Sequence, residues 1–561
     1  MSVKFVSTLL SLLFVLPTFV SSKPLSPTKV DSTLQGEITT HVKLQNTKIY
    51  GLKGYVYVND GAILEIQKGT IIVGDEPGNN SAIIINRGGK IIAEGTPTDP
   101  IVFTSRAPAG QRQRGDWGGI VICGKGKTNH PGGQAAIEGG IADPTTGGKG
   151  WFGGNDDSDN SGILRYVRIE FPGIALSPNN ELNGLTLGGV GNKTIIDHVQ
   201  ISYSNDDAFE WFGGSVNAHH LISYGTLDDD FDTDNGFRGK VQFGIAKRFR
   251  TVADVSTSQT FESDNDAQSS YNQPMTSAIF SNITGVGPIE DTSWTMGSGQ
   301  NQYNSKFGAA VQIRRNSRIS IYNSVFVGWP RGLEIAQVPT MVAAAGDSLE
   351  IRNNSWYGIK GSAMTLAGGT PPTTIDQNWI TKKEYGNVVE KSTPSLSEIH
   401  NPFSSDVEFN PSIKNGSPLE NSALFGEKLS DSFFEKVSFR GAVGLERWDL
   451  GWTEYDPINK EYTPKIVGVN EEPIFVGMTA TAFPNPTTSF STIRYTLNSD
   501  DVVDVKLVGI TGNVISTFIS QDHQISGIYE FKLITTDLVS GIYFLTITGT
   551  KNTITLPISV R

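Results

Sequence analysis

Cysteine and charged residues are scarce in this chain. Its 561 residues include a single cysteine, Cys123, so no disulfide can form within the chain. Packing and hydrogen bonds must therefore hold the fold together. Charged residues make up only 18% of the chain, with a formal net charge of −12. Nucleic-acid binding needs a basic stripe, so this balance excludes a nucleic-acid partner and is compatible with cation binding.

Long apolar runs are missing beyond the first residues. No later stretch approaches the about 18–20 apolar residues that a spanning helix needs, so we expect the protein not to span a membrane. At the start, Lys4 precedes the apolar residues 5–20, and Ser21–Lys23 supplies small residues. This pattern predicts a secretory signal peptide over residues 1–22. No cysteine follows the apolar run, which excludes a lipoprotein anchor there.

Glycine is abundant, with 62 residues, but it shows no three-residue period, which excludes collagen. Short apolar segments alternate with turns that arrive before any hairpin could extend. They occur at residues 55–58, 62–66, 69–74, 82–85, 88–93 and 100–105. Such segments stack as rungs, so we expect an all-β fold with a right-handed parallel β-helix over residues 23–365. Cys123 lies within one such segment and is predicted to be a buried strand residue.

A 22-residue repeat supports this prediction. The segment from His198 to Glu210 aligns with the segment from His220 to Asp232. We interpret the offset as one coil of the solenoid. A third acidic run, Phe261–Asp266, is expected on a later coil.

Residues 366–455 break the repeat, with prolines, helix-compatible stretches and clustered aromatic residues. We expect them to cap the open end of the last coil, because a bare end would template aggregation. Residues 456–478 are rich in Pro, Lys, Glu and Val and are predicted to be a linker. Residues 479–561 are predicted to form a small β-sandwich, with alternating strands separated by Gly, Asn and Pro turns.

Four ordered motifs in this last module resemble the type A C-terminal sorting domain of the Bacteroidetes type IX secretion system. They are the opening Phe483–Pro486, a central turn glycine at Gly512, the segment Leu538–Tyr543 and the basic last residue Arg561. One departure is Thr511–Asn513, where the family usually places glycine before a basic residue. The resemblance implies export to the cell surface or medium, with the type IX machinery and a cell-surface sortase as partners.

The body is similar to a broad group of Bacteroidetes surface proteins with predicted, pectin-lyase-like β-helices. The segments that carry this resemblance are Gly115–Gly119, Arg440–Ala442 and Gly451–Trp452. The resemblance implies fold and habitat and carries no activity.

The acidic repeat is the group of residues best suited to binding or catalysis. One coil of 22 residues would stack Asp206 on Asp228, Asp207 on Asp229 and Glu210 on Asp232. Strands lie about 4.8 Å apart, and carboxylates at that spacing repel one another. A bound cation would relieve the repulsion, and Ca²⁺ suits several hard oxygen ligands. The candidate metal ligands are Asp206, Asp207, Glu210, Asp228, Asp229, Asp230, Asp232 and Asp234.

The same residues are compatible with two alternatives to a cation site. The acidic turns could be exposed to solvent and neutralised by Arg238, Lys240 and Arg248. Alternatively, the chain could be a polysaccharide lyase or glycoside hydrolase, with Asp207, Asp229, Arg238 and Lys240 as catalytic candidates. The segments 205–207 and 238–240 are similar to two elements of polygalacturonases, but the Gly-His-Gly element between them is missing.

The adjacent His219 and His220 should point to opposite faces of a strand and so are not expected to share a metal ion. His198 and His220, one coil apart, are predicted to form a structural stack. No organic cofactor is expected. We therefore expect a secreted, non-catalytic β-helix that binds glycans or serves as an adhesive or structural solenoid, with a polysaccharide as a candidate partner and the enzyme as the alternative.

Overall fold

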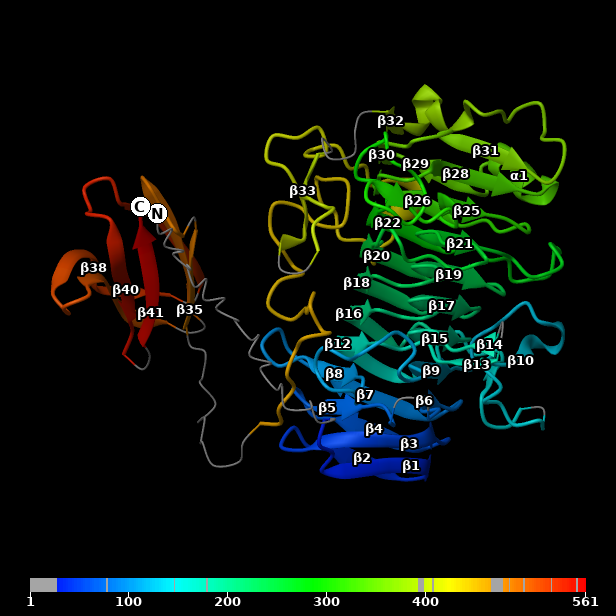
Figure 1. The fold of residues 1–561 in the computed structure, drawn as a ribbon, viewed down its shortest axis with the longest axis horizontal. Helices are drawn as coiled ribbons and strands as arrows, with labels where there is room; N and C mark the ends of the chain where they lie inside the picture. Colours follow the sequence, from blue (N-terminus) through cyan, green and yellow to red (C-terminus); the bar gives the residue numbers. More distant parts are fainter. Residues whose placement is uncertain are drawn as a thin grey trace, which may run out of the picture. The chain divides into compact units, whose positions relative to one another are not determined.

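The structure is a computed structural model of the chain, and it forms two compact units, residues 1–465 and 466–561 (Figure 1). Each unit is described by itself. The residues that it describes are 28–76, 79–145, 147–177, 180–391, 398–405, 408–465, 478–483, 485–497, 500–525, 527–550 and 553–561. The predicted signal peptide, residues 1–22, lies outside them. In the described part, no helix is both long enough and apolar enough to cross a bilayer.

The first unit is a parallel β-helix built from three sheets that run the length of the solenoid. In the first sheet, strands from successive coils pair in parallel register. It contains β2 (His41–Leu44), β4 (Ile63–Ile66), β7 (Lys90–Glu94), the first parts of β12 (Gly162–Glu170), β16 (Ile195–Ser202), β18 (Asn217–Tyr224), β20 (Lys240–Lys247) and β22 (Ile279–Val286), then β26 (Ser320–Tyr322) and β29 (Glu350–Arg352).

The second sheet includes the second parts of the same long strands, which follow the bend. It contains the first parts of β1 (Ser32–Ile38) and β3 (Ile49–Val58), then β5 (Ile71–Val73), β8 (Ile101–Thr104), the second parts of β12, β16, β18, β20 and β22, and finally β27 (Val325–Val327), β30 (Ser355–Tyr357) and β32 (Val388–Glu390).

The third sheet closes the coil and carries the candidate site. It contains the second parts of β1 and β3, then β6 (Ala82–Ile85), β9 (Ile120–Cys123), β15 (Leu185–Gly188), β17 (Phe209–Phe212), β19 (Phe231–Asp234), β21 (Phe261–Ser263), β25 (Ala309–Ile313), β28 (Arg331–Ala336) and β31 (Met364–Ala367).

Apolar side chains from all three sheets fill the inside of the solenoid as one continuous core. Strands expose alternate residues to opposite faces, so each coil contributes its inward positions to this core. The rings of Phe209, Phe231 and Phe261 stack there on successive coils, with centroids 5.7 and 5.3 Å apart. Cys123 is fully buried, as predicted. The core therefore holds the fold without a disulfide.

In each of the long strands β12, β16, β18, β20 and β22, the bend between the first and second sheets places one residue at a positive φ. His198, His220 and Asn282 adopt φ values of 53°, 54° and 57°. This left-handed conformation is unfavourable for most side chains but tolerated by Asn and His. The bend aligns these side chains in a column along the outside of the solenoid.

Shorter elements leave the coils as excursions. They are the hairpins β10 (Gln134–Ala136) with β11 (Trp151–Gly153) and β13 (Ala175–Ser177) with β14 (Asn180–Glu181), the pair β23 (Thr295–Met296) and β24 (Gln302–Tyr303), helix α1 (Val338–Ala345), the 3₁₀ turns η1 (Pro131–Gly133), η2 (Trp379–Thr381), η3 (Lys383–Tyr385) and η6 (Glu427–Ser430), and the pair β33 (Ile399–Asn401) and β34 (Asn410–Ile413). The first two hairpins matter most here, because they border the candidate site.

The predicted cap, residues 366–455, does two different things. Its first part places Ile375, Trp379 and Ile380 in the solenoid core, where they follow the last strands. The part after residue 398 does not cover the end, so this expectation needs correction. It runs back along the flank of the solenoid, beside β22, β20, β18 and β16 (Figure 1). We call residues 398–465 the strap.

The strap pairs with polar side chains on the outside of the coils. Its contacts move toward earlier coils as the chain proceeds: Asn353 to Ser422 O, Asn282 to Phe439 O, Gln200 to Glu454 O and Glu170 to Tyr462 Oη, at 2.9, 2.8, 2.7 and 2.7 Å. The outward amides of the bends need hydrogen-bond partners, and the strap backbone supplies them.

The first part of the predicted linker belongs to this strap. Tyr462 is hydrogen-bonded to Glu170, and Arg112 donates to Pro457 O and Lys460 O at 2.6 and 2.7 Å. Residues 456–465 are thus packed on the β-helix rather than free. Residues 466–477 lie outside the described part of the chain.

The second unit is a small antiparallel sandwich of two sheets. One contains β35 (Met478–Phe483), β36 (Phe490–Leu497) and β39 (Gly527–Ile534). The other contains β38 (Val514–Gln524), β37 (Asp501–Gly509), β40 (Gly541–Thr548) and β41 (Thr553–Val560). Both sheets contribute to one apolar core, which includes Ile493, Val505 and Leu545. The unit therefore has its own hydrophobic interior, as predicted from its alternating strands.

Candidate functional site

The acidic repeat lies on the outer face of the third sheet. In the register of this sheet, Glu210 pairs with Asp232, and Asp232 pairs with Glu262. The neighbouring Phe209 and Phe231 face the core, so the carboxylates must face outward. The predicted 22-residue coil and the pairing of Glu210 with Asp232 are therefore confirmed.

The turns that precede these strands bring in the other carboxylates. The backbone N–H of Asp229 donates to Asp207 Oδ1 at 2.7 Å, and the N–H of Gln259 donates to Asp229 Oδ1 at 2.5 Å. Each carboxylate thus accepts a hydrogen bond from the backbone of the next coil. The stacking of Asp207 on Asp229 follows the predicted repeat.

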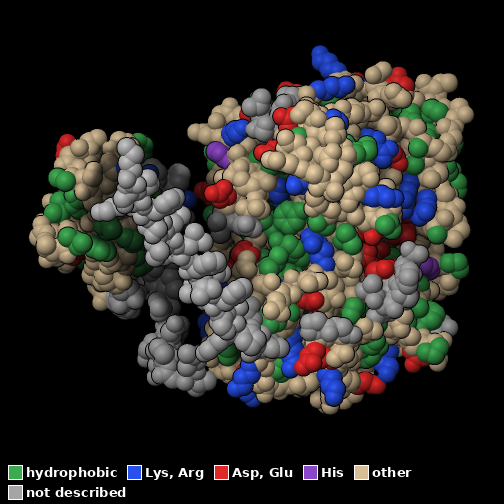
Figure 2. Space-filling view, viewed as in Figure 1, with side chains coloured by type: hydrophobic (Ala, Val, Ile, Leu, Met, Phe, Trp, Pro, Cys, Tyr) green, Lys and Arg blue, Asp and Glu red, His purple; other side chains and the backbone are tan. Residues whose placement is uncertain are grey.

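Two groups of three carboxylates bring ligand atoms within 4.8 Å of one another. One group is Asp206, Asp207 and Asp228, and the other is Asp207, Glu210 and Asp232. Asp207 belongs to both. We call the six residues Asp206, Asp207, Glu210, Asp228, Asp229 and Asp232 the acidic cluster. Figure 2 shows acidic side chains gathered over β17 and β19.

Part of the cluster lines a cavity of about 390 Å³. The lining residues are Glu138, Glu181, Asn183, Asn205, Asp206, Asp207, Glu210, Leu227, Asp228, Asp254, Val255 and Ser256. None of them is Lys, Arg or His. Asn183 Nδ2 donates to Glu138 Oε1 at 2.8 Å and also to Glu210 Oε2, tying an excursion to the sheet.

Sequence reasoning missed Glu138, Glu181 and Asp254. Glu138 follows β10, Glu181 ends β14, and Asp254 lies in the long loop after β20. None of the three belongs to the 22-residue repeat, so the repeat gave no signal for them. They reach the cavity only because the excursions fold back over the third sheet.

The carboxylates of the cluster are buried, and none of them forms an ion pair with Lys or Arg among the described residues. Asp207, Glu210 and Asp229 are 7, 6 and 3% exposed. Burial raises the pKa of Asp206, Asp207, Glu210, Asp229 and Asp232 well above their usual range, and repulsion from neighbouring carboxylates raises these pKa values further. The same two causes raise the pKa of Asp228 to about 7. The site therefore favours either protons or a cation.

Two carboxylate oxygens in the cluster are buried and make no hydrogen bond. They are Asp228 Oδ1 and Asp232 Oδ1. Buried polar atoms in native proteins nearly always have a partner, so such orphaned oxygens point to a missing positive group. Among the described residues, the cluster forms no ion pair with Lys or Arg. All donors are hard oxygens, which fits Ca²⁺ better than a metal that prefers nitrogen or sulfur.

The basic residues that were expected to neutralise the cluster are engaged elsewhere. Arg238 donates to Asp157 at 2.8 Å, and Lys240 pairs with Asp431 of the strap at 2.5 Å. Arg248 is buried and pairs with Asp230 at 2.9 Å. Neutralisation by Arg238 and Lys240 was therefore wrong. Arg248 forms an ion pair with Asp230 and also opposes the rise in the pKa of Asp228 and Asp229.

Two predicted metal ligands stand apart from the cluster. Asp230 is fully buried; its Oδ1 accepts from both Arg248 and Ser223, whereas its Oδ2 has no hydrogen-bond partner among the described residues. It joins neither group of close carboxylates, so the structure does not bring it together with the other predicted ligands. Asp234 Oδ1 accepts from the N–H of Asn235 at 2.5 Å, and it joins neither group of close carboxylates.

The catalytic candidates are likewise not brought together. Asp207 and Asp229 lie in consecutive turns, but Arg238 and Lys240 are paired with acids outside the cavity. The structure therefore does not bring the two candidate carboxylates together with the two candidate basic residues.

The histidines form the predicted stack on the bend column. The rings of His198 and His220 lie 4.1 Å apart between centroids, and Asp197 Oδ1 lies 2.8 and 2.9 Å from their Nδ1 atoms. His219 faces the strap and contacts Phe433 O at 3.2 Å. Both rings lie near Phe243, but His219 does not join the close group of Asp197, His198 and His220.

Comparison with known proteins agrees with this architecture. Residues 36–395 match the family described as pectate-lyase like beta helix domain, and residues 481–561 match the secretion system C-terminal sorting domain. No curated protein matches the chain. Among solved structures, the chain is similar to the Dettilon tailspike protein, with 11% identity, coverage of 91% of this chain and 74% of that chain, and a TM-score of 0.21.

The sorting domain identifies the chain as cargo of the type IX secretion system, exported to the cell surface or the extracellular medium. The match over residues 36–395 covers most of the chain and coincides with the three-sheet solenoid. The chain therefore belongs to the pectate-lyase-like β-helix family.

Proposed function

We propose that this secreted β-helix is a non-catalytic surface solenoid that binds a divalent cation, with Ca²⁺ the best fit, in the acidic cluster. The single observation that carries the proposal is the buried cluster of carboxylates, which has no ion pair with a basic residue in the described part of the chain. Asp207 would bridge the two groups of ligands, and Glu210 and Asp232 would complete the second. A bound cation would supply the missing positive charge and the partners of the orphaned oxygens.

A bound cation would also explain the arrangement of the excursions. Glu138 and Glu181 approach the cluster from two separate hairpins, and Asp254 approaches from a third loop. Without a cation, like charges would push these loops away from the sheet. With one, the loops would be held against the coils, as expected for a surface protein that must resist unfolding outside the cell.

Glycan binding at the cavity follows from the same chemistry. Divalent cations on a protein surface keep free coordination positions for external oxygens, such as sugar hydroxyls or carboxylates. A cation in this cavity would therefore link the solenoid to a polysaccharide. Without the cation, the density of carboxylates would repel an acidic glycan.

The alternative is a polysaccharide lyase or a glycoside hydrolase. One observation favours it: the carboxyl group of Asp228 has a pKa of about 7 and faces a cavity, as a general acid would. A lyase also needs a base near the substrate, and the basic candidates are engaged elsewhere. We therefore expect no turnover of uronate-rich polysaccharide.

The experiment is a calorimetric titration of the metal-free protein with Ca²⁺, with a parallel assay for unsaturated uronates and reducing ends. The wild type should bind Ca²⁺, and an Asp207→Asn, Asp232→Asn double variant should not. Asp60→Asn is the matched control, because Asp60 is a carboxylate with a 79% exposed side chain far along the chain from the cluster. Absence of Ca²⁺ binding by the wild type would refute the proposal. Turnover that is lost in Asp228→Asn would establish the enzyme instead.

A further inference from the structure

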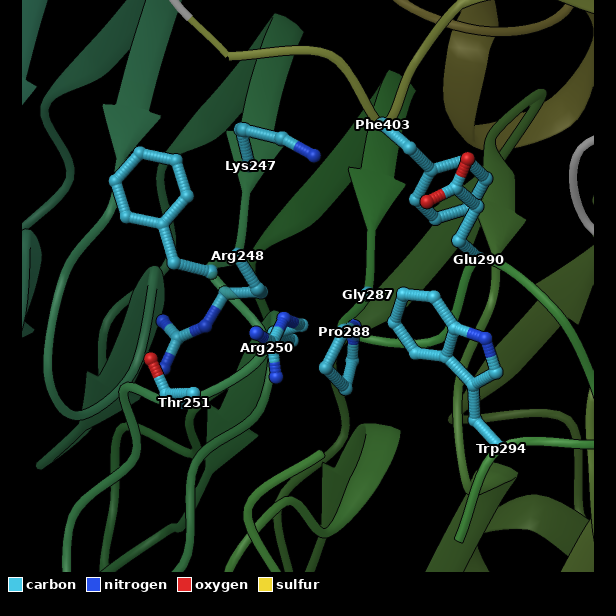
Figure 3. Close-up of a pocket in the computed structure, with 10 residues that line it drawn as sticks. Lys247, Arg248, Arg250, Thr251, Gly287, Pro288, Glu290, Trp294 and Phe403 are labelled. Atoms are coloured by element: carbon cyan, nitrogen blue, oxygen red, sulfur yellow. The ribbon is translucent and has the colours of Figure 1, made fainter. Parts of the chain in front are cut away.

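A second cavity, of about 320 Å³, lies where β20 and β22 end (Figure 3). It is lined by Lys247, Arg248, Phe249, Arg250, Thr251, Gly287, Pro288, Glu290, Trp294 and Phe403. Three of these residues are basic and one is acidic. The charge of this cavity is thus opposite to that of the acidic cluster.

Lys247 is the unusual residue in this cavity. In the second sheet it pairs with Tyr224 on one side and Val286 on the other, so it occupies a position where its neighbours are aromatic or aliphatic. The residue is only 3% exposed. Among the residues that the structure describes, none accepts a hydrogen bond from its amine or forms an ion pair with it. Its contacts are with the rings of Phe403 and Phe409, at 5.3 and 6.0 Å.

A buried ammonium group without a counter-ion is unfavourable, and ring contacts replace only part of its lost hydration. Burial accordingly lowers the pKa of Lys247 to about 7, and the carboxylate of Glu290 acts in the opposite direction. Figure 3 shows the amine directed toward the part of the cavity where Phe403, Glu290 and Trp294 lie. An anion placed there would restore the missing partner.

The other lining residues fit an anion that carries a ring. Arg250 is held by Gly299 O and Gln302 O, at 2.7 and 3.0 Å, and no carboxylate among the described residues pairs with it. Arg248 is already neutralised by Asp230. Trp294 packs its inner side against the core and remains partly exposed, so its ring offers a flat apolar wall.

We propose that this cavity binds a ring-bearing anion about the size of one sugar residue. The anionic group, a carboxylate or a sulfate, contacts Lys247 and Arg250, and the ring lies against Trp294. The volume is at the lower end of the range of small-molecule sites, which favours one ring over a longer chain. This site goes beyond the proposed function, because it differs in position and charge and needs no cation.

The test is calorimetric titration of the full chain in the presence of a chelator, so that cation binding plays no part. The probes are glucuronate, glucose 6-sulfate and neutral glucose. Glucuronate, the sulfated sugar or both should bind with a Kd in the range of about 1 mM, and glucose should bind at least about tenfold more weakly. The two anionic probes distinguish a carboxylate ligand from a sulfate ligand.

Variants locate the binding. Lys247→Met should weaken the anionic probes at least about tenfold, because it removes the charge and keeps the length of the side chain. Glu290→Gln is the matched control and should bind as well as the wild type or better, since it removes the one opposing charge. Trp294→Ala tests the ring contact and serves also if Lys247→Met does not fold. Failure of both anionic probes to bind, equal binding of glucose, or unchanged affinity in Lys247→Met and Trp294→Ala would overturn the proposal.

Discussion

Two neighbouring stretches of the third sheet carry outward carboxylates in the same column but balance them differently. In β17 and β19, Glu210 and Asp232 have no basic partner among the described residues. One coil further, Glu262 in β21 is bonded to Arg314, and Asp264 lies 2.9 and 2.5 Å from Arg314 and Arg315. Figure 2 shows basic side chains over β21 and β25, beside the acidic ones over β17 and β19.

The difference shows that the fold does not force these carboxylates to stay unpaired. The coil geometry is the same in both stretches. In the paired stretch, Gln312 lies beside Glu262 in the sheet, and Arg314, two residues later, reaches back to Glu262 on the previous coil. No described coil that borders the acidic cluster carries an arginine at the position equivalent to Arg314. We interpret the unpaired stretch as a binding site and the paired stretch as ordinary structural neutralisation.

The largest effect expected from this comparison is a dependence of stability on pH in the absence of cations. The raised pKa values mean that the folded protein binds more protons than the unfolded chain between about pH 4 and pH 7, so stability falls as pH rises through this window. Asp228, with a pKa of about 7, titrates within this window. Thermal unfolding in a chelator should give a Tm lower by several degrees at about pH 8 than at about pH 5. A Tm that rises over this interval would contradict the interpretation.

The next effect concerns the paired stretch. Arg314→Met removes the partner of Glu262 and Asp264, whose side chains are 16 and 5% exposed. Breaking a buried pair by removing one partner leaves an unbalanced charge, so unfolding in denaturant should show a loss of about 3 kcal/mol at neutral pH. Burial already raises the pKa of Glu262 to about 7, so this loss should shrink in acid.

Arg331→Met is the matched control for this variant. Arg331 pairs with Glu334 in the same sheet, but its side chain is 40% exposed. A partly solvated pair should contribute less than about 1 kcal/mol. An equal loss of unfolding free energy in the two variants would show that the Arg314 contact has no special role in neutralisation.

The smallest effect concerns a single acid in the unpaired stretch. Asp232→Asn keeps the shape of the side chain and removes one of several repelling charges, so in a chelator it should stabilise the protein by about 1 kcal/mol. The informative result is that Asp232→Asn should raise the stability of the protein, whereas Arg314→Met should lower it. Destabilisation of the metal-free protein by Asp232→Asn would mean that this carboxylate has a structural partner.

The sequence repeat predicted which site residues stack on successive coils. Strands of successive coils pair in register, so residues one coil apart in sequence lie next to each other in the sheet. One coil of 22 residues placed Glu210 under Asp232 and Asp207 under Asp229. It also predicted the histidine stack, since His198 and His220 occupy the same bend. Such relations need only the period of the fold.

Contacts between different sheets, or between the coils and the excursions or the strap, were not predictable in the same way. Lys240 is close to Asp232 in sequence, but it begins β20 in the first sheet, after a turn that separates it from the third sheet. A spacing of eight residues therefore crosses from one face of the solenoid to another. Glu138 and Glu181 reach the cavity through excursions, and the strap covers the flank through contacts more than 200 residues apart in sequence, such as Gln200 with Glu454.

The most direct test is the change in Tm that Ca²⁺ causes at about pH 7.5 in the wild type and in the Asp207→Asn, Asp232→Asn variant. A ligand that binds only the folded state at about a hundred times its Kd stabilises by about 2.7 kcal/mol, which should raise the wild-type Tm by roughly 2–4 °C. We predict this increase in the wild type and none in the variant. An unchanged wild-type Tm, or an equal increase in the variant, would contradict a cation site in the acidic cluster.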